Sequence, residues 1–145
     1  MTDTRTLIGF TSMVAAVLLG AACGSDDAAG RTDAAAVQGT VWTLDELAGE
    51  SIADGVQVTL EYDGQRVTGT GGCNRYNGGA TFDDGVVTIG PEIISTRMAC
   101  QDPAADVELR YLQALPRAAR FVVQDDTLRI DDGEGEPLLV FTVSA

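Results

Sequence analysis

Gly71-Gly72-Cys73-Asn74-Arg75-Tyr76-Asn77-Gly78 is the most distinctive segment of this sequence, and Thr96-Arg97-Met98-Ala99-Cys100 follows it within the same stretch of chain. Glycine permits positive φ values and close approach of the backbone, and asparagine favours turns. The first segment therefore predicts a structural turn, formed by Gly71, Gly72, Asn74, Asn77 and Gly78.

The same segment has a second interpretation as a binding site. A nest of backbone N–H groups, with Arg75 and Tyr76 on an exposed loop, would suit a carboxylate or a phosphate. A Walker phosphate loop is excluded because it requires a lysine, and the chain contains none. We favour the structural role, since such clusters usually serve backbone geometry, and keep Arg75 and Tyr76 as the candidate binding residues.

The three cysteines have separate roles in this interpretation. An odd number of cysteines in an exported protein requires an explanation for the unpaired thiol, which lipidation of Cys23 would supply. Cys73 and Cys100 then form an even pair, for which a disulfide is the usual state in an oxidising compartment. The alternative is two buried free thiols.

The N-terminal segment predicts export. Residues 7–22 carry no charge, and the run Leu18-Leu19-Gly20-Ala21-Ala22-Cys23 places small residues directly before a cysteine. This pattern resembles a bacterial lipoprotein signal, which implies removal of residues 1–22 and a diacylglyceryl group on Cys23. The alternatives are an uncleaved anchor and an ordinary secretory peptide. The anchor is disfavoured because a spanning helix needs about 18 or more apolar residues, and the small residues are typical of a cleavage site.

The rest of the chain divides into a tether and one domain. Residues 24–36 contain no large apolar side chain, so we expect residues 23–37 to form a flexible tether. The remaining residues, 38–145, are enough for one domain and too few for two.

This domain is expected to be mainly β with one short helix. Roughly eight short apolar runs, several of them bounded by Asp-Gly turns, predict strands. Asp102-Pro103 predicts a helix start, and Val107, Tyr111 and Leu115 recur at helical spacing up to Pro116. We therefore expect a single-domain curled antiparallel sheet or a small β-barrel, capped by the helix. The strands are expected near residues 41–44, 56–62, 66–70, 81–82, 86–89, 121–123, 127–130 and 138–143, with another extended segment at 93–98.

Composition excludes several kinds of chemistry and of partner. The net charge of −13 disfavours nucleic acid as a partner. Because histidine is absent, Ser-His-Asp and Cys-His nucleophiles and histidine-ligated metals are excluded. We expect no catalytic residue, cofactor or metal, and we interpret residues 131–136 as a solvated acidic turn rather than a calcium loop.

Taken together, the two opening motifs resemble those of the META domain (HslJ-like) family. Its members share an early Trp, a G-G-C-N-x-Y-x-G element, a T-x-M-A-C element, a short helix with Glu and closing hydrophobic strands. The matching positions here are Trp42, residues 71–78, residues 96–100, Glu108 and residues 128–141, so that the resemblance covers about residues 38–144.

The resemblance implies a compact β-rich domain on exported or lipid-anchored envelope proteins, associated with stress tolerance and without an established catalytic activity. Our first hypothesis is a non-enzymatic, outward-facing protein of the cell membrane, anchored through lipid on Cys23, that binds an unknown envelope protein or small ligand. The alternative is an inhibitor-type module against an exported hydrolase, for which an acidic domain would suit a basic enzyme. A carboxylate-based enzyme is the weakest reading.

Overall fold

The computed structural model describes residues 29–145. The expected signal segment, the lipidation site Cys23 and the first part of the tether therefore lie outside the described residues. No helix in the described part of the chain has the length and apolar character needed to cross a membrane.

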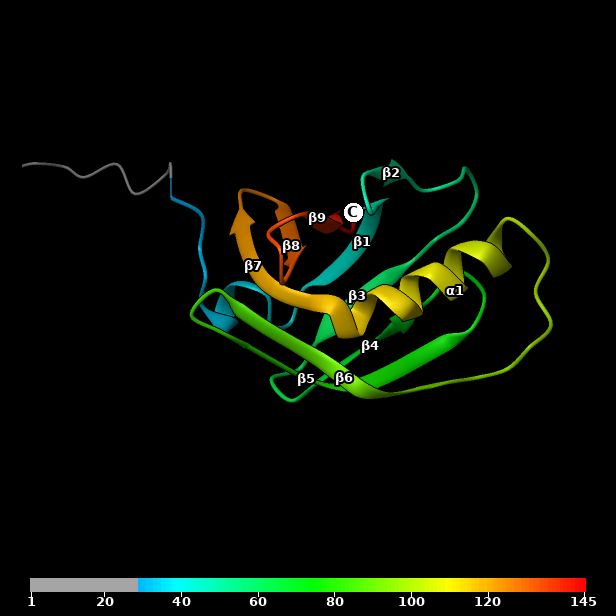
Figure 1. Cartoon of the computed structure of the whole chain (residues 1–145), viewed down its shortest axis with the longest axis horizontal. Coiled ribbons are helices and arrows are strands. Elements are labelled where there is room, and N and C mark those ends of the chain that lie inside the picture. The colour runs from blue at the N-terminus through cyan, green and yellow to red at the C-terminus, as the bar shows by residue number, and fades with distance from the viewer. Residues whose placement is uncertain (1–28) are drawn as a thin grey trace, which may run out of the picture.

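Within residues 29–145, eight antiparallel strands close into a barrel, and a short ninth strand extends one edge (Figure 1). The barrel closes where β1 pairs with β9, from Trp42 opposite Val143 to Leu47 opposite Leu139. This arrangement confirms the expected mainly β fold with one short helix and shows that the sheet is a closed barrel. The elements are η2 Ala34–Ala36, β1 Val41–Leu47, β2 Glu50–Ser51, β3 Thr59–Tyr62, β4 Arg66–Thr70, β5 Arg75–Asp83, β6 Val86–Ser95, α1 Ala104–Ala114, η3 Leu115–Arg117, β7 Ala118–Gln124, β8 Thr127–Asp132 and β9 Pro137–Val143.

Two Asp-Gly sequences form the expected hairpins. The Asp63 carboxylate accepts hydrogen bonds from the backbone N–H groups of Gln65 and Arg66, at 2.8 Å each, and these bonds lower its pKa. Asp84 and Gly85 turn the chain from β5 into β6 with positive φ values of 46° and 74°. Local turn chemistry thus sets the register of both hairpins.

Helix α1 lies before the last three strands, as expected, but begins one residue later than Asp102 would place it. Pro103 occupies the N-cap position and makes no side-chain cap. The expected Asp102 cap is wrong because a turn precedes the helix, closed by the Ala105 N–H donating to the Gln101 carbonyl at 3.1 Å. Pro116 lies in η3, directly after the helix.

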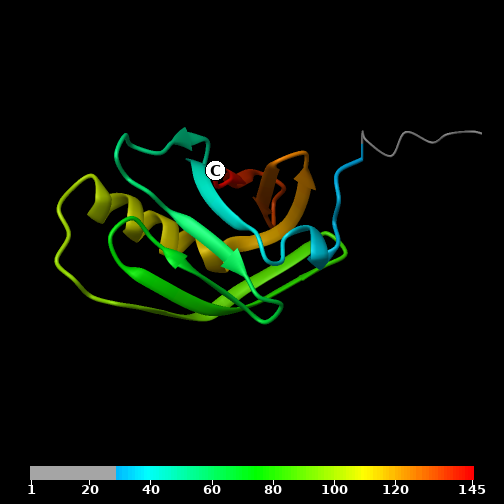
Figure 2. The same ribbon diagram turned by 180° about the vertical axis from the view of Figure 1, so that it is seen from behind.

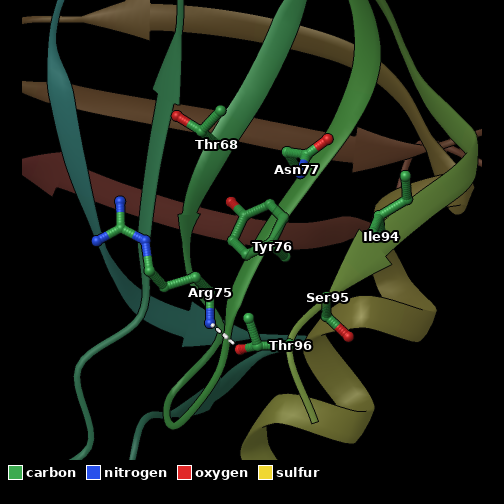
Figure 3. A pocket seen from close by; sticks show the side chains of 7 residues that line it. All are labelled: Thr68, Arg75, Tyr76, Asn77, Ile94, Ser95 and Thr96. Atoms are coloured by element: carbon green, nitrogen blue, oxygen red, sulfur yellow. Dashed lines mark hydrogen bonds between the residues drawn. The ribbon is translucent and has the colours of Figure 1, made fainter.

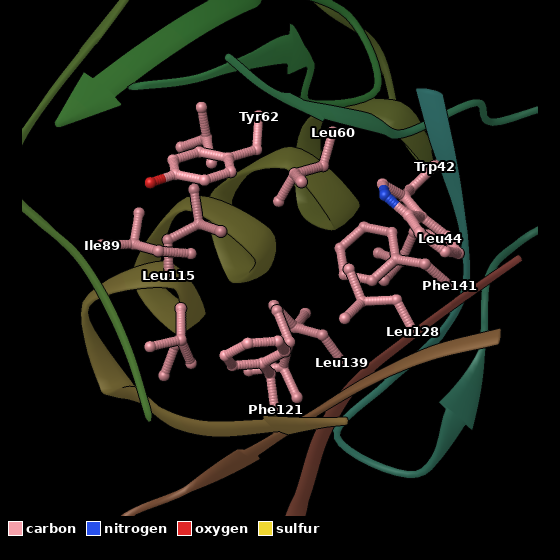
Figure 4. Close-up of a cluster of buried hydrophobic side chains, with 14 of the residues drawn as sticks. Trp42, Leu44, Leu60, Tyr62, Ile89, Leu115, Phe121, Leu128, Leu139 and Phe141 are labelled. Atoms are coloured by element: carbon pink, nitrogen blue, oxygen red, sulfur yellow. The ribbon is translucent and has the colours of Figure 1, made fainter. Parts of the chain in front are cut away.

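One apolar core fills the barrel, with the helix across one opening (Figure 4). Alternate residues point inward along most strands, as in β5, and Tyr111 and Leu115 enter from α1 and η3 with no exposed surface. Full burial of one large apolar side chain stabilises a fold by about 1.5–3 kcal/mol. The largest fully buried side chains include Trp42, Tyr111, Phe141, Leu60, Ile89, Leu115, Leu128, Ile130 and Leu139.

The folded part of the chain begins earlier than residue 38. The N–H and C=O of Arg31 bond to the C=O and N–H of Val123 at 2.7 and 2.8 Å, and the Thr32 carbonyl accepts from the Gly85 N–H at 2.8 Å. Figure 2 shows this segment beside the β5–β6 turn. Val37 is fully buried, and its carbonyl accepts from the Trp42 indole N–H at 3.2 Å. The expectation that all of residues 23–37 form a flexible tether is therefore wrong for residues 31–37.

Candidate functional site

The glycine-rich segment forms the connection between β4 and β5. The Gly71 N–H donates to the Asn74 carbonyl at 2.8 Å. Gly72 has a φ of +124°, and a Cβ at this position would lie 3.2 Å from Val56 Cγ1 and 3.3 Å from the Ala104 carbonyl oxygen. Both the dihedral angle and the close packing therefore require glycine at position 72.

Asn77 and Gly78 do not belong to this turn. They lie inside β5, where Asn77 pairs with Thr68 of β4 and Gly78 pairs with Ile93 of β6. The sequence interpretation was wrong here because Asn and Gly favour turns locally, whereas pairing with two neighbouring strands holds them extended. The register shifts just after Gly78, so the glycine lies next to a bulge in the ladder.

Glu108 of α1 occupies the backbone nest of the turn. Its Oε2 accepts from the N–H groups of Cys73 and Asn74 at 3.1 and 2.5 Å, and its Oε1 accepts from the Asn74 side-chain amide at 2.7 Å. All three partners donate, as a carboxylate requires. The nest that the sequence suggested for an external anion is therefore filled by a carboxylate of the protein itself.

Asn74 links this nest to the second motif. Its side-chain oxygen accepts from the Thr96 hydroxyl at 3.0 Å and from the Met98 N–H at 2.7 Å. Next to it, the predicted Cys73–Cys100 disulfide is confirmed, with the two Cα atoms 6.1 Å apart. The residues of the two motifs thus hold the turn, the segment after β6 and the helix together.

Tyr76 is a core residue and not an exposed binding residue. It is 3% exposed, and its hydroxyl lies 2.6 Å from the Tyr111 hydroxyl and donates to the Thr59 carbonyl at 2.9 Å. Burial raises the pKa of Tyr76 well above the usual tyrosine value. The expected exposure was wrong because Arg75 and Tyr76 are neighbours in a strand, where consecutive side chains point to opposite faces.

Arg75 is exposed and lies on a groove over the outer face of β4, β5 and the end of β6 (Figure 3). The groove has a volume of about 340 Å³. Figure 3 shows Arg75 on one side and Ile94 on the other. The backbone N–H of Arg75 donates to the Thr96 hydroxyl at 3.1 Å, which fixes the end of the groove to the second motif. The lining residues are Thr68, Arg75, Tyr76, Asn77, Ile94, Ser95 and Thr96.

The charge of Arg75 is uncommitted, meaning that no carboxylate pairs with it. The arginines that line three other surface grooves are paired with carboxylates. Arg110 pairs with Glu50 at 2.6 Å, Arg117 with Asp132 at 3.2 Å, and Arg129 with Asp131 at 2.6 Å. Among residues 29–145, no carboxylate forms an ion pair with Arg75. Arg75 is therefore a groove-lining cation that is available to a ligand.

In the acidic turn at residues 131–136, the carboxylate of Asp132 binds groups of the protein itself. Asp132 accepts from the N–H groups of Glu136 and Glu134 at 3.0 and 2.9 Å and pairs with Arg117. The backbone bonds, that of Glu136 first, and the Arg117 charge lower the pKa of Asp132. In the described part of the chain, no three Cys, Asp or Glu side chains gather as metal ligands would.

Fold and site together define a class: a small, disulfide-braced β-barrel with one capping helix and a polar groove on its outer face. Residues 35–145 match the META domain family, and the chain belongs to that family. No curated protein matches the chain.

Two solved structures resemble the protein. One is the NMR structure of a protein from Burkholderia xenovorans, with 31% sequence identity and a TM-score of 0.61, over 75% of this chain and 84% of that chain. A second NMR structure has 18% identity and a TM-score of 0.58, over 74% of this chain and 91% of that chain, and indicates a shared fold alone.

Proposed function

We propose that this META-domain protein is a non-enzymatic binding protein of the cell envelope, anchored through lipid on Cys23, and that the groove at Arg75 is its binding face. The uncommitted Arg75 charge on this groove is the observation that carries the proposal. An HslJ-like role in envelope stress tolerance is the physiological setting that we propose.

The chemistry of the groove favours binding over catalysis. Its lining offers hydroxyl, amide and guanidinium groups and no carboxylate or thiol. Since the sequence also lacks histidine and lysine, the groove lining offers no carboxylate, imidazole or amine as the general base that would activate a hydroxyl as a nucleophile. Hydrogen-bond donors beside an exposed apolar side chain, Ile94, are what a recognition surface requires.

The position of the groove supports an outward-facing role. Arg75 begins β5, whereas residues 31 and 32 bond near the turn that follows the end of β5. Strands rise by about 3.3 Å per residue, so the groove and the entry point of the N-terminal segment lie at opposite ends of a nine-residue strand. A groove so placed is accessible when the N-terminal side faces a membrane.

Photo-crosslinking in cells tests this proposal. A photo-reactive amino acid replaces Thr68 in the Arg75 groove or, as a matched control, Thr127 in the groove at Arg129. We expect a crosslinked product in the membrane fraction from position 68, lost on Arg75→Ala, and none from position 127. Equal products from both positions, or none from either, would contradict binding of an envelope macromolecule at this face.

A further inference from the structure

We infer that the groove at Arg75 recognises a single compact oxyanion, a carboxylate or a phosphate, carried on a larger polar ligand. This inference rests on the proposed binding role of the groove and specifies the chemistry of its ligand. The site is the outer surface of the β-sheet, and it is distinct from the nest that Glu108 fills.

Arg75 supplies the positive charge that an oxyanion requires. The guanidinium of Arg75 can bind a carboxylate or a phosphate through two parallel N–H groups. In the protein, the guanidiniums of Arg110, Arg117 and Arg129 already meet carboxylates. Arg75 forms no ion pair within residues 29–145, so its guanidinium can offer two N–H groups to an external anion and supplies local attraction in a chain whose net charge of −13 otherwise repels anions.

Further hydrogen-bond donors line the groove around Arg75. Arg66 donates to the side-chain oxygen of Asn77, and because arginine only donates, this contact fixes which end of the amide is the oxygen. The NH₂ group of Asn77 remains as a donor on the groove. The hydroxyl of Thr68, which lies opposite Asn77, also lines it, and none of the hydrogen bonds found within residues 29–145 uses this hydroxyl or the Asn77 NH₂ group.

Carboxylates near the groove limit the size of the anion that it can accept. Glu61 lies directly opposite Thr68 on the next strand, and Glu92 is exposed two residues before Ile94 on β6. These carboxylates flank the groove on both sides. They would repel a long polyanion that extended past the groove, so the groove suits a single small oxyanion held by Arg75.

An NMR titration of the full-length, ¹⁵N-labelled protein in detergent micelles tests the inference. The probes are sodium acetate and inorganic phosphate, with sodium chloride at matched ionic strength as the control. We expect saturable shifts of the amide signals of residues 75–77 and 94–96 with at least one oxyanion and not with chloride. The tighter of the two oxyanions identifies carboxylate or phosphate as the natural group.

Two variants separate the groove from general charge effects. Arg75→Ala should raise the dissociation constant of the oxyanion at least about tenfold. Arg75→Lys should have a dissociation constant between those of Arg75→Ala and the wild type, because lysine keeps the charge without the paired N–H groups. Arg120→Ala, which removes the same charge from an exposed position outside the groove, should change the constant by less than about twofold.

The outcomes distinguish this inference from the proposed function. Absence of saturable shifts with both oxyanions, or shifts that survive Arg75→Ala, overturns the oxyanion inference. If position 68 still crosslinks an envelope component in that case, the binding role of the groove stands with a different ligand. If an oxyanion binds through Arg75 and no crosslinked product forms, the ligand chemistry stands and the macromolecular partner is excluded.

Discussion

The carboxylate of Glu108 takes the place of a bound anion in the backbone nest of the β4–β5 turn and stabilises that turn. Two backbone N–H groups and one side-chain amide point at its carboxylate. The residue is 8% exposed, and a buried carboxylate is costly unless its oxygens accept hydrogen bonds. The buried carboxylate of Glu108 therefore needs the N–H groups of the turn, and the turn needs this carboxylate to accept its hydrogen bonds.

Replacing Glu108 by Gln tests this dependence. Because both oxygens accept from N–H groups, either orientation of the new amide places an N–H group against a donor. We expect the free energy of unfolding, measured by urea denaturation, to fall by about 1–3 kcal/mol. Glu46→Gln, at an exposed position of β1, should change it by less than about 0.5 kcal/mol. Equal effects of the two substitutions would exclude the role of Glu108 in the nest.

The Tyr76–Tyr111 pair predicts alkaline sensitivity. Burial raises the pKa of both phenols, whereas unfolded tyrosines lose their protons near pH 10. The contribution of the pair to stability is therefore complete below about pH 10 and is lost as the pH rises above it. In urea denaturation at about pH 8 to 11, the wild type should lose stability more steeply than Tyr76→Phe with Tyr111→Phe. Parallel pH profiles would contradict this prediction.

At the scale of elements, the hairpins and the helix were predictable because local residues specify them. Asp63 and the Asp84-Gly85 pair supply turn chemistry by themselves, and the apolar spacing of α1 is visible in the sequence. The start of β5 was not predictable by the same means, since Asn77 and Gly78 are held extended by neighbouring strands. One signal was present: Tyr76, Gly78, Ala80 and Phe82 alternate as the inward side of a strand.

The order of segment 31–37 was also not predictable from the sequence. Its residues are mostly small or polar, which is typical of a tether. Its order depends on backbone bonds of Arg31 and Thr32 to distant strands and on burial of Ala36 and Val37. The position of Glu108 within the turn was likewise hidden, because the sequence marks it only through the family resemblance and its partners lie 34 and 35 residues away.

The disulfide connects elements that are otherwise held together by Asn74 and Glu108. Cys73 and Cys100 are separated by 27 residues, for which loop entropy predicts a stabilisation of about 3–4 kcal/mol. We expect neither thiol to react with an alkylating agent before reduction, and we expect reduction to lower the melting temperature. A Cys73→Ala, Cys100→Ala variant, already destabilised, should not respond to the reductant. Full alkylation of the native protein without reductant would rule out the bridge.

At the scale of the whole molecule, the number of strands and their alternation predict one curled antiparallel sheet. They do not predict that this sheet closes into a barrel. A curled open sheet satisfies the same pattern, and the difference lies in the pairing of β1 with β9, which joins the two ends of the domain. Arg75 could be named from the sequence as a candidate. Its groove could not, because strands β4, β5 and β6 form it together.

The anchoring proposal predicts a clear separation between export signal and fold. Cys23→Ser should abolish lipid labelling and shift the protein out of the membrane fraction. Its melting temperature should stay unchanged, because the core lies wholly within residues 36–141. If the variant remains in the membrane with its N-terminus intact, residues 7–22 act as an anchor and the lipidation proposal is wrong.

The bonds of Arg31 and Thr32 at the far end of β5 also determine how mechanical load would pass through the molecule. A pull on the N-terminal segment would act first on the backbone bonds from Arg31 to Val123 and from Thr32 to Gly85. The opposite end, where Arg75 begins β5 and the disulfide braces the turn, would carry little of that force. The protein could thus yield at its point of attachment while the groove keeps its shape.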